Sequence, residues 1–95
     1  MQNIAIDDLK NKLYNSKIID IRNKASYEIE HIESAINVSK LELMSIPDKY
    51  INKNEIVYIY CETGMNSWGV CSTLNLKGYH TINVLGGFKA WKKLK

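Results

Sequence analysis

The chain has 95 residues, of which 45% are hydrophobic and 24% charged, and its formal net charge is +3. This length supports one domain over residues 1–95 with one modest core, and it excludes a cofactor domain joined to a separate substrate domain. The lysines are scattered and no apolar run reaches the length of a membrane span, so we expect neither nucleic-acid binding nor a membrane segment.

The first half of the chain alternates strand-like and helix-like segments. In chain order we expect a strand at 3–5, a helix at 6–14, a strand at 17–21, a short helix at 25–29 and a strand at 35–38. The run at 17–21 is compact and rich in β-branched residues, which favours a strand.

The second half continues the alternation. The expected elements are, in order, a helix at 40–45, a strand at 56–60, a helix at 67–77, a strand at 81–85 and a helix at 88–94. Ser39 and Ser67 can cap the helices that follow them, and Gly78 suits the position after a helix end. The unbroken apolar run at 56–60 predicts a central strand buried on both faces. Together these elements predict an α/β fold with a mainly parallel five-stranded sheet and helices on both faces.

The segment after the central strand carries the clearest chemical signal. Cys61 follows the strand directly, and a six-residue loop leads to the next helix: Glu62, Thr63, Gly64, Met65, Asn66 and Ser67. In a parallel sheet, functional loops lie at the carboxyl ends of strands. Backbone N–H groups of such a loop and the positive end of a helix stabilise an anion, and a thiolate or a persulfide is an anion. The hydroxyls of Thr63 and Ser67 are further candidate donors. We therefore interpret Cys61 as a reactive thiol.

The two cysteines, Cys61 and Cys71, form neither a CxxC pair nor a zinc pattern, so we expect free thiols and no metal or cofactor. No secretory signal is evident in MQNIAIDDLK, which predicts a cytoplasmic protein. Cys71 is expected on a buried helix face, where a resolving role is disfavoured. The small size and mild charge favour a monomer.

Four motifs in the same order give the chain a resemblance to the single-domain rhodaneses, a family of sulfurtransferases. DIR at 20–22 and HIESAIN at 31–37 resemble two of its segments. The loop CETGMNS at 61–67 resembles its Cys-x-x-Gly-x-x-Ser loop, and LGGFKAW at 85–91 resembles its closing motif. The resemblance covers almost the whole chain.

The resemblance implies a mechanism and its partners. Cys61 would take the outer sulfur of thiosulfate or a persulfide donor, hold it as a persulfide against residues 62–67, and pass it to a thiophilic acceptor. That acceptor is cyanide in the assay and a thiol or a protein in the cell. Asp20 and Arg22 would support the site, and we favour a structural role for Asp20 as a cap or as a partner of Arg22.

Some positions depart from the family pattern. Asn66 stands where many relatives have arginine, and Glu62 adds a negative charge if it faces the mouth of the site. We therefore expect thiosulfate to be a poor donor beside a persulfide or protein donor. Arg22 lacks the usual acidic partner, since Ser26 occupies that position, and Glu28 or Glu30 are the candidate replacements.

Several alternatives are weighed against this interpretation. A cysteine phosphatase needs an arginine at the end of a Cys-x5-Arg loop, whereas position 67 is serine and Arg22 is the only arginine. A persulfide carrier fed by another enzyme would share the Cys61 chemistry, and a non-catalytic interaction module would have no need of a reactive Cys61. Trp68 either walls the pocket or lies on the helix surface. His31 is interpreted as a cap or turn residue, and His80 is placed at the far end of its strand.

Overall fold

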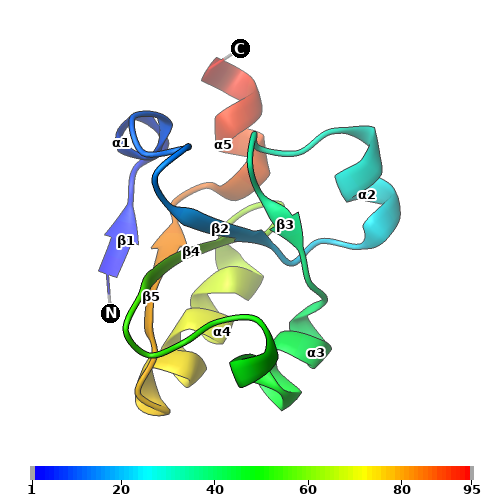
Figure 1. Cartoon of the computed structure of the whole chain (residues 1–95). Coiled ribbons are helices and arrows are strands. Elements are labelled where there is room, and N and C mark those ends of the chain that lie inside the picture. The colour runs from blue at the N-terminus through cyan, green and yellow to red at the C-terminus, as the bar shows by residue number, and fades with distance from the viewer. Residues whose placement is uncertain (1, 95) are drawn as a thin grey trace.

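The computed structural model describes residues 2–94, which form one five-stranded sheet with helices on both faces (Figure 1). The strands are β1 (Gln2–Ile4), β2 (Lys17–Asp20), β3 (Ile36–Asn37), β4 (Ile56–Tyr60) and β5 (His80–Val84). Their order across the sheet is β1-β5-β4-β2-β3, and every neighbouring pair is parallel. All the carboxyl ends therefore meet at one edge of the sheet.

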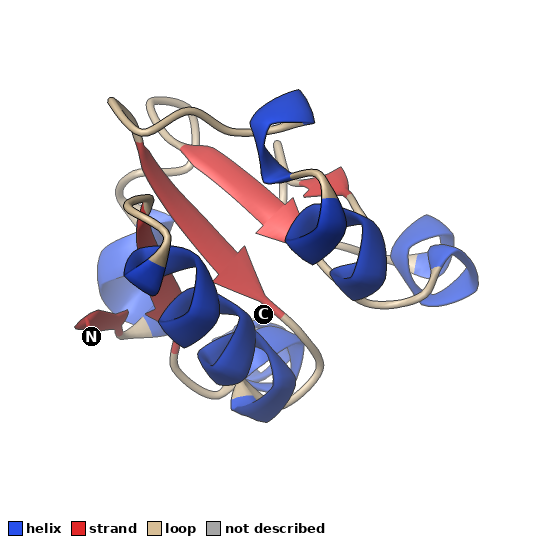
Figure 2. Cartoon of the chain, turned by 90° about the horizontal axis from the view of Figure 1, so that it is seen from below, coloured by secondary structure: helices blue, strands red, loops and turns tan. Residues whose placement is uncertain are grey.

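Five α-helices and one 3₁₀ turn connect the strands. They are α1 (Ile6–Lys10), α2 (Lys24–Ile29), α3 (Lys40–Ser45), η1 (Pro47–Lys49), α4 (Met65–Leu76) and α5 (Gly87–Leu94). Figure 1 shows α3 and α4 below the sheet and α1 and α5 above it, and the view from below in Figure 2 shows α3 and α4 in front of the strands. This is the two-faced cover that a parallel sheet requires.

The central strand β4 divides the core into two layers. Val57 and Ile59 join a buried cluster with residues of α3 and α4, whereas Tyr58 and Tyr60 join a second cluster with residues of α1 and α5. Alternate side chains of a strand point to opposite faces, so a run that is apolar at every position serves both layers. The prediction of a doubly covered central strand is confirmed.

Most predicted elements are confirmed to within one or two residues, but one helix prediction is wrong at its end and one predicted cap residue is wrong. The helix expected at 6–14 ends at Lys10, because the N–H groups of Asn11 and Lys12 bond to carbonyls three residues back, at 3.3 and 2.8 Å, instead of four. The helix expected from Ser67 begins at Met65, with Gly64 as its N-cap residue. Ser67 is therefore no cap. By contrast, Ser39 does cap α3, since its hydroxyl accepts the Glu42 N–H at 3.2 Å.

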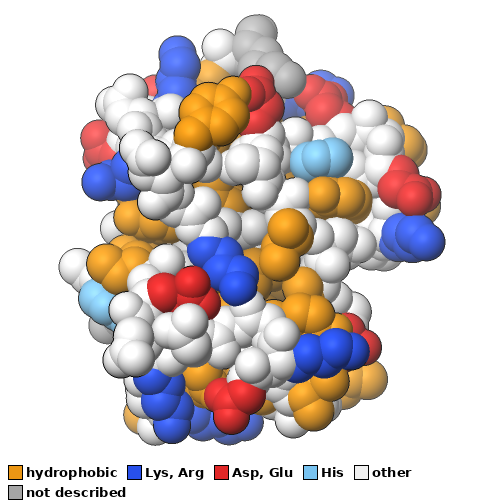
Figure 3. Space-filling model, in the orientation of Figure 1, with side chains coloured by type: hydrophobic (Ala, Val, Ile, Leu, Met, Phe, Trp, Pro, Cys, Tyr) orange, Lys and Arg blue, Asp and Glu red, His pale blue; other side chains and the backbone are white. Residues whose placement is uncertain are grey.

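Positive and negative side chains are interspersed on the face seen in Figure 3, which carries no block of one sign. Between residues 2 and 94 no helix is long and apolar enough to cross a membrane. The same residues hold no cluster of His, Cys, Asp or Glu side chains able to bind a metal ion.

Candidate active site

Cys61 lies at the carboxyl edge of the sheet, directly after β4. The strand hydrogen bonding continues to this point, since the Tyr60 carbonyl accepts the Ile21 N–H at 3.0 Å. The thiol is 4% exposed and lies at the rim of the core on the α4 side. The chain must turn here to enter α4, and that turn surrounds the sulfur.

Two N–H donors and one hydroxyl group approach the Cys61 sulfur from one side. Gly64 N–H donates to Sγ at 3.1 Å, Ser67 N–H donates at 3.3 Å, and the Ser67 hydroxyl lies 3.4 Å away. Both N–H groups belong to the unpaired start of α4, where the helix dipole is positive. The arrangement favours a negative charge on sulfur.

Gly64 makes this geometry possible. Its φ is +92°, a value that L side chains rarely adopt. A Cβ at this position would lie 3.0 Å from Gly86 N and 3.1 Å from Val84 O, so the loop packs tightly on the end of β5. The glycine therefore serves both the turn around the sulfur and the close approach of β5.

Asn83 of β5 hydrogen-bonds to the loop around Cys61, and the sequence patterns described above did not indicate it as a site residue. Its side chain is 2% exposed, accepts the Ser67 hydroxyl at 2.5 Å and donates to the Gly64 carbonyl at 3.2 Å. It also donates to Asn3 on β1 at 3.1 Å. An amide between two apolar residues of a predicted strand was the available signal, because a buried amide must find partners.

The two thiols have opposite environments. Burial raises the pKa of Cys61, but hydrogen bonds from the Ser67 hydroxyl and from the N–H groups of Ser67, Gly64 and Thr63 outweigh it, so the pKa is lowered overall. Burial raises the pKa of Cys71 to about 11, and the Thr81 side chain offsets only part of that rise. Only Cys61 combines a stabilised thiolate with an opening to solvent, which is the pattern of a reactive cysteine.

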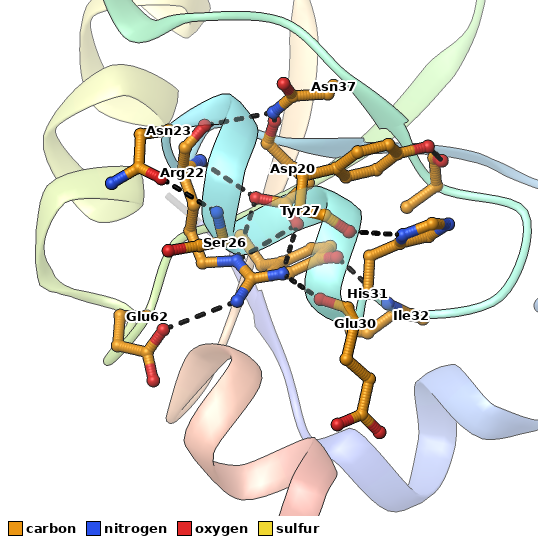
Figure 4. Close-up of polar contacts among 12 residues, drawn as sticks. Asp20, Arg22, Asn23, Ser26, Tyr27, Glu30, His31, Ile32, Asn37 and Glu62 are labelled. Atoms are coloured by element: carbon orange, nitrogen blue, oxygen red, sulfur yellow. Dashed lines mark hydrogen bonds and ion pairs between the residues drawn. The ribbon is translucent and has the colours of Figure 1, made fainter.

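Asp20 and Arg22 form a buried ion pair close to the Cys61 loop (Figure 4). The Arg22 guanidinium donates to both Asp20 oxygens, at 2.8 to 3.1 Å, and Asp20 also accepts the Arg22 N–H at 2.8 Å. The guanidinium lies 4.0 Å from the centre of the Phe88 ring, and its Nη1 lies 3.5 Å from the Glu62 carboxylate. The predicted pairing of Asp20 with Arg22 is confirmed.

The suggested pairing of Arg22 with the carboxylate of Glu28 or Glu30 is wrong. Arg22 Nη2 donates to the Glu30 backbone carbonyl at 2.6 Å, while the Glu30 carboxylate pairs with Lys92 at 3.0 Å. Because α2 ends at Ile29, the C-cap residue Glu30 presents its backbone carbonyl to Arg22, while its own side chain points away (Figure 4). Glu62 reaches the guanidinium from the loop instead.

A cavity of about 390 Å³ opens over Cys61. It is lined by Ile21, Arg22, Asn23, Ser26, Lys40, Cys61, Glu62 and Asn66. Glu62 therefore does face the mouth of the site, beside Asn66. The sequence alone does not indicate Lys40, Asn23 or Ser26 as site residues, because they lie at the starts of α3 and α2, far from the loop in sequence.

The remaining loop residues face the other way. Thr63, Met65 and Trp68 line a second cavity of about 430 Å³, between the loop and the end of β5. Trp68 is 52% exposed, so it lies on the helix surface and walls this second cavity, away from the opening over the sulfur. Thr63 contributes its N–H, and no bond from its hydroxyl to the sulfur is present.

Neither histidine contacts Cys61 within residues 2–94. His31 stacks on Tyr27 with ring centres 3.8 Å apart and bonds to the Tyr27 carbonyl at 2.7 Å. His80 begins β5 at the opposite edge of the sheet. The thiolate is thus stabilised by N–H and hydroxyl donors without an imidazole base.

The comparison with known families matches nearly the whole chain. The family described as "Rhodanese-like domain" matches residues 5–94. A "Thiosulfate sulfurtransferase GlpE" of Coxiella burnetii is 36% identical over 76 residues, which are 79% of this chain and 70% of that protein. A "Thiosulfate sulfurtransferase PspE" of Escherichia coli is 33% identical over 76 residues, covering 75% of this chain and 69% of its own.

Solved structures agree with the family match. The crystal structure of a rhodanese-like domain protein from Staphylococcus aureus has a TM-score of 0.83 and 36% identity, covering 96% of this chain and 91% of the other. A rhodanese-related protein from Thermoplasma volcanium has a TM-score of 0.88 at 22% identity over 98% of this chain and 92% of its own, a likeness of fold.

Proposed function

This chain belongs to the rhodanese-like domain family, and from that premise we propose that it is a sulfurtransferase whose sulfur carrier is Cys61. The observation that carries the proposal is the pair of N–H groups that donate to Sγ at 3.1 and 3.3 Å, with the Ser67 hydroxyl 3.4 Å from the same sulfur. Two of the relatives described above are named thiosulfate sulfurtransferases.

In the first half of the reaction, the Cys61 thiolate attacks the outer sulfur of the donor. A new sulfur–sulfur bond forms at Cys61 and the donor's own bond to that sulfur breaks. With thiosulfate the electron pair leaves on sulfite, and with an organic persulfide it leaves on a thiolate. The persulfide anion on Cys61 then takes the same donors that hold the thiolate, an oxyanion-hole arrangement applied to sulfur.

In the second half, a nucleophile removes the outer sulfur. Cyanide leaves as thiocyanate in an assay, and a small thiol or a protein thiol is the acceptor in the cell. This second transfer restores the Cys61 thiolate, so the full cycle consumes no oxidant or cofactor. Residues 62–67 form the binding loop, and Asp20 and Arg22 position it through Glu62. We place this reaction in the cytoplasm and in a monomer.

Steady-state kinetics with thiosulfate and cyanide test the proposal. A covalent intermediate predicts ping-pong kinetics, seen as parallel lines in double-reciprocal plots of thiocyanate formation. Cys61→Ser should abolish thiocyanate formation, whereas Cys71→Ala should keep it. Intersecting lines, or thiocyanate formation by Cys61→Ser, would contradict a Cys61 persulfide.

A further inference from the structure

The charges around the Cys61 cavity are unevenly available to a ligand. The Arg22 side chain is 7% exposed, and its guanidinium is already held by both oxygens of Asp20 and by Glu62. It also lies against the Phe88 ring at 4.0 Å. A donor molecule entering the cavity therefore meets an arginine whose positive charge is compensated by two carboxylates.

Lys40 is the other cation that lines this cavity. It is the first residue of α3, its side chain is exposed, and no ion pair of Lys40 occurs within residues 2–94. Asn66 on the facing loop is neutral. Lys40 is thus the one lining cation whose charge is free to meet an anionic donor.

Glu62 places a negative charge at the same cavity. Its carboxylate is half exposed, lines the same cavity and lies at the edge of the Arg22 guanidinium rather than within the buried pair. Asp20 already neutralises Arg22 at shorter distance, so the Glu62 charge is only partly compensated. A second negative charge on a donor would approach this partly compensated carboxylate.

We propose that Lys40 binds the anionic end of the sulfur donor and that Glu62 limits its charge, so that the site takes monoanionic sulfur donors in preference to dianions. This inference rests on the proposed function, since it assigns the substrate class of the Cys61 site. It is based on the residues that line the cavity, on the distances between Arg22 and its two carboxylates, and on the exposure of the Lys40 and Glu62 side chains. Neither side chain takes part in the bond changes at sulfur.

Two small donors with the same outer sulfur isolate the effect of charge. Thiosulfate is a dianion, and methanethiosulfonate is a monoanion. Attack by the Cys61 thiolate forms the same persulfide from both, and the electron pair leaves on sulfite from the first and on methanesulfinate from the second. The two reactions differ chiefly in the leaving group, so variants are compared with the wild-type protein for each donor separately.

The experiment measures kcat and KM for both donors in wild type, Lys40→Gln, Glu62→Gln and the control Lys12→Gln. Lys12 is an exposed lysine before the amino end of β2, at the edge of the sheet away from Cys61. For thiosulfate, Lys40→Gln should raise KM and Glu62→Gln should lower it by about threefold to fivefold each, as solvent-exposed charge pairs allow. For methanethiosulfonate the same changes should be about half as large in free energy, because the donor carries half the charge.

The expected pattern is therefore a shift in the thiosulfate-to-methanethiosulfonate ratio of KM values, in opposite directions for the two variants. Lys12→Gln should leave the ratio at its wild-type value. Equal effects on both donors, or a ratio that Lys40→Gln and Glu62→Gln leave unchanged, overturn the inference while sulfur transfer itself stands. Failure of the wild-type protein to transfer sulfur from either donor overturns the proposed function and the inference together.

Discussion

Burial and hydrogen bonding oppose each other at the Cys61 sulfur. Burial alone raises a thiol pKa, as it does at Cys71. At Cys61 the Ser67 hydroxyl and the N–H groups of Ser67, Gly64 and Thr63 bond to the charged form, and the pKa falls. The residue therefore reaches its thiolate at a lower pH than an ordinary cysteine, whose pKa is about 8.5.

Removing the Ser67 hydroxyl should reverse this balance. In Ser67→Ala the burial remains and the largest of the contributions that lower the pKa of Cys61 is lost, so this pKa rises. Because a thiol alkylates as its thiolate, the pH profile of Cys61 alkylation should move to higher pH and the rate at pH 7 should fall several-fold. Iodoacetamide labelling followed by mass spectrometry of the Cys61 peptide measures both.

The control is Ser72→Ala, the same change on the same helix away from the sulfur, which should leave the profile in place. Cys71 should remain unlabelled in all folded variants. A Ser67→Ala profile that coincides with the wild-type profile would show that the hydroxyl does not stabilise the thiolate.

At this scale the sequence predicted the reactive cysteine and its loop but not the residues that arrive from elsewhere. Cys61, Gly64 and Ser67 are local, so their spacing carries the information. Asn83 and Lys40 come from β5 and α3, and only the packing of those elements brings them to the site. No periodicity in a single sequence encodes such contacts.

At the scale of elements, the first residues of α5 hydrogen-bond to the loop that begins at Cys61. The carbonyls of Cys61 and Glu62 accept the N–H groups of Phe88 and Lys89 at 2.9 and 3.0 Å. These N–H groups have no partner within α5, so the loop satisfies the helix start and the helix fixes the loop. Gly87 stands at the closest approach, where a Cβ would lie 2.4 Å from the Cys61 carbonyl oxygen.

Gly87→Ala should therefore disturb both elements. The φ of Gly87 is +59°, and the added Cβ meets backbone atoms of the loop that cannot move independently. We expect a loss of at least about 2 kcal/mol in the free energy of unfolding, measured by urea denaturation, from strain and displacement of the loop. Thiocyanate formation by the folded fraction should fall as well.

Gly69→Ala is the matched control, since a Cβ on this α4 residue meets nothing within 4 Å. It should stabilise the protein by about 0.5–1 kcal/mol, the gain of alanine over glycine inside a helix. Equal stability changes in the two variants would contradict the close contact between Gly87 and the loop.

The helix that carries the site also shows where sequence reasoning fails. Ser67 looked like a cap because serine favours that position. Gly64 takes the cap position instead, and α4 starts early enough to turn the Ser67 N–H and hydroxyl toward the sulfur. The preference of serine for cap positions therefore does not decide where α4 begins.

At the scale of the whole molecule, the sheet order places β4 between β5 and β2. Cys61 therefore lies where the carboxyl ends of three strands and the starts of α4 and α5 converge. The alternation of strands and helices was enough to predict this architecture, because parallel strands with helical crossovers leave few arrangements.

The central claim is that Cys61 carries sulfur, and intact mass tests it most directly. After incubation with thiosulfate or methanethiosulfonate, the protein should gain one sulfur (about 32 Da), as expected for a covalent intermediate. Cyanide should remove the added mass, and Cys61→Ser should never acquire it. A wild-type protein that gains no sulfur from either donor, or a Cys61→Ser variant that gains it equally, would contradict the account.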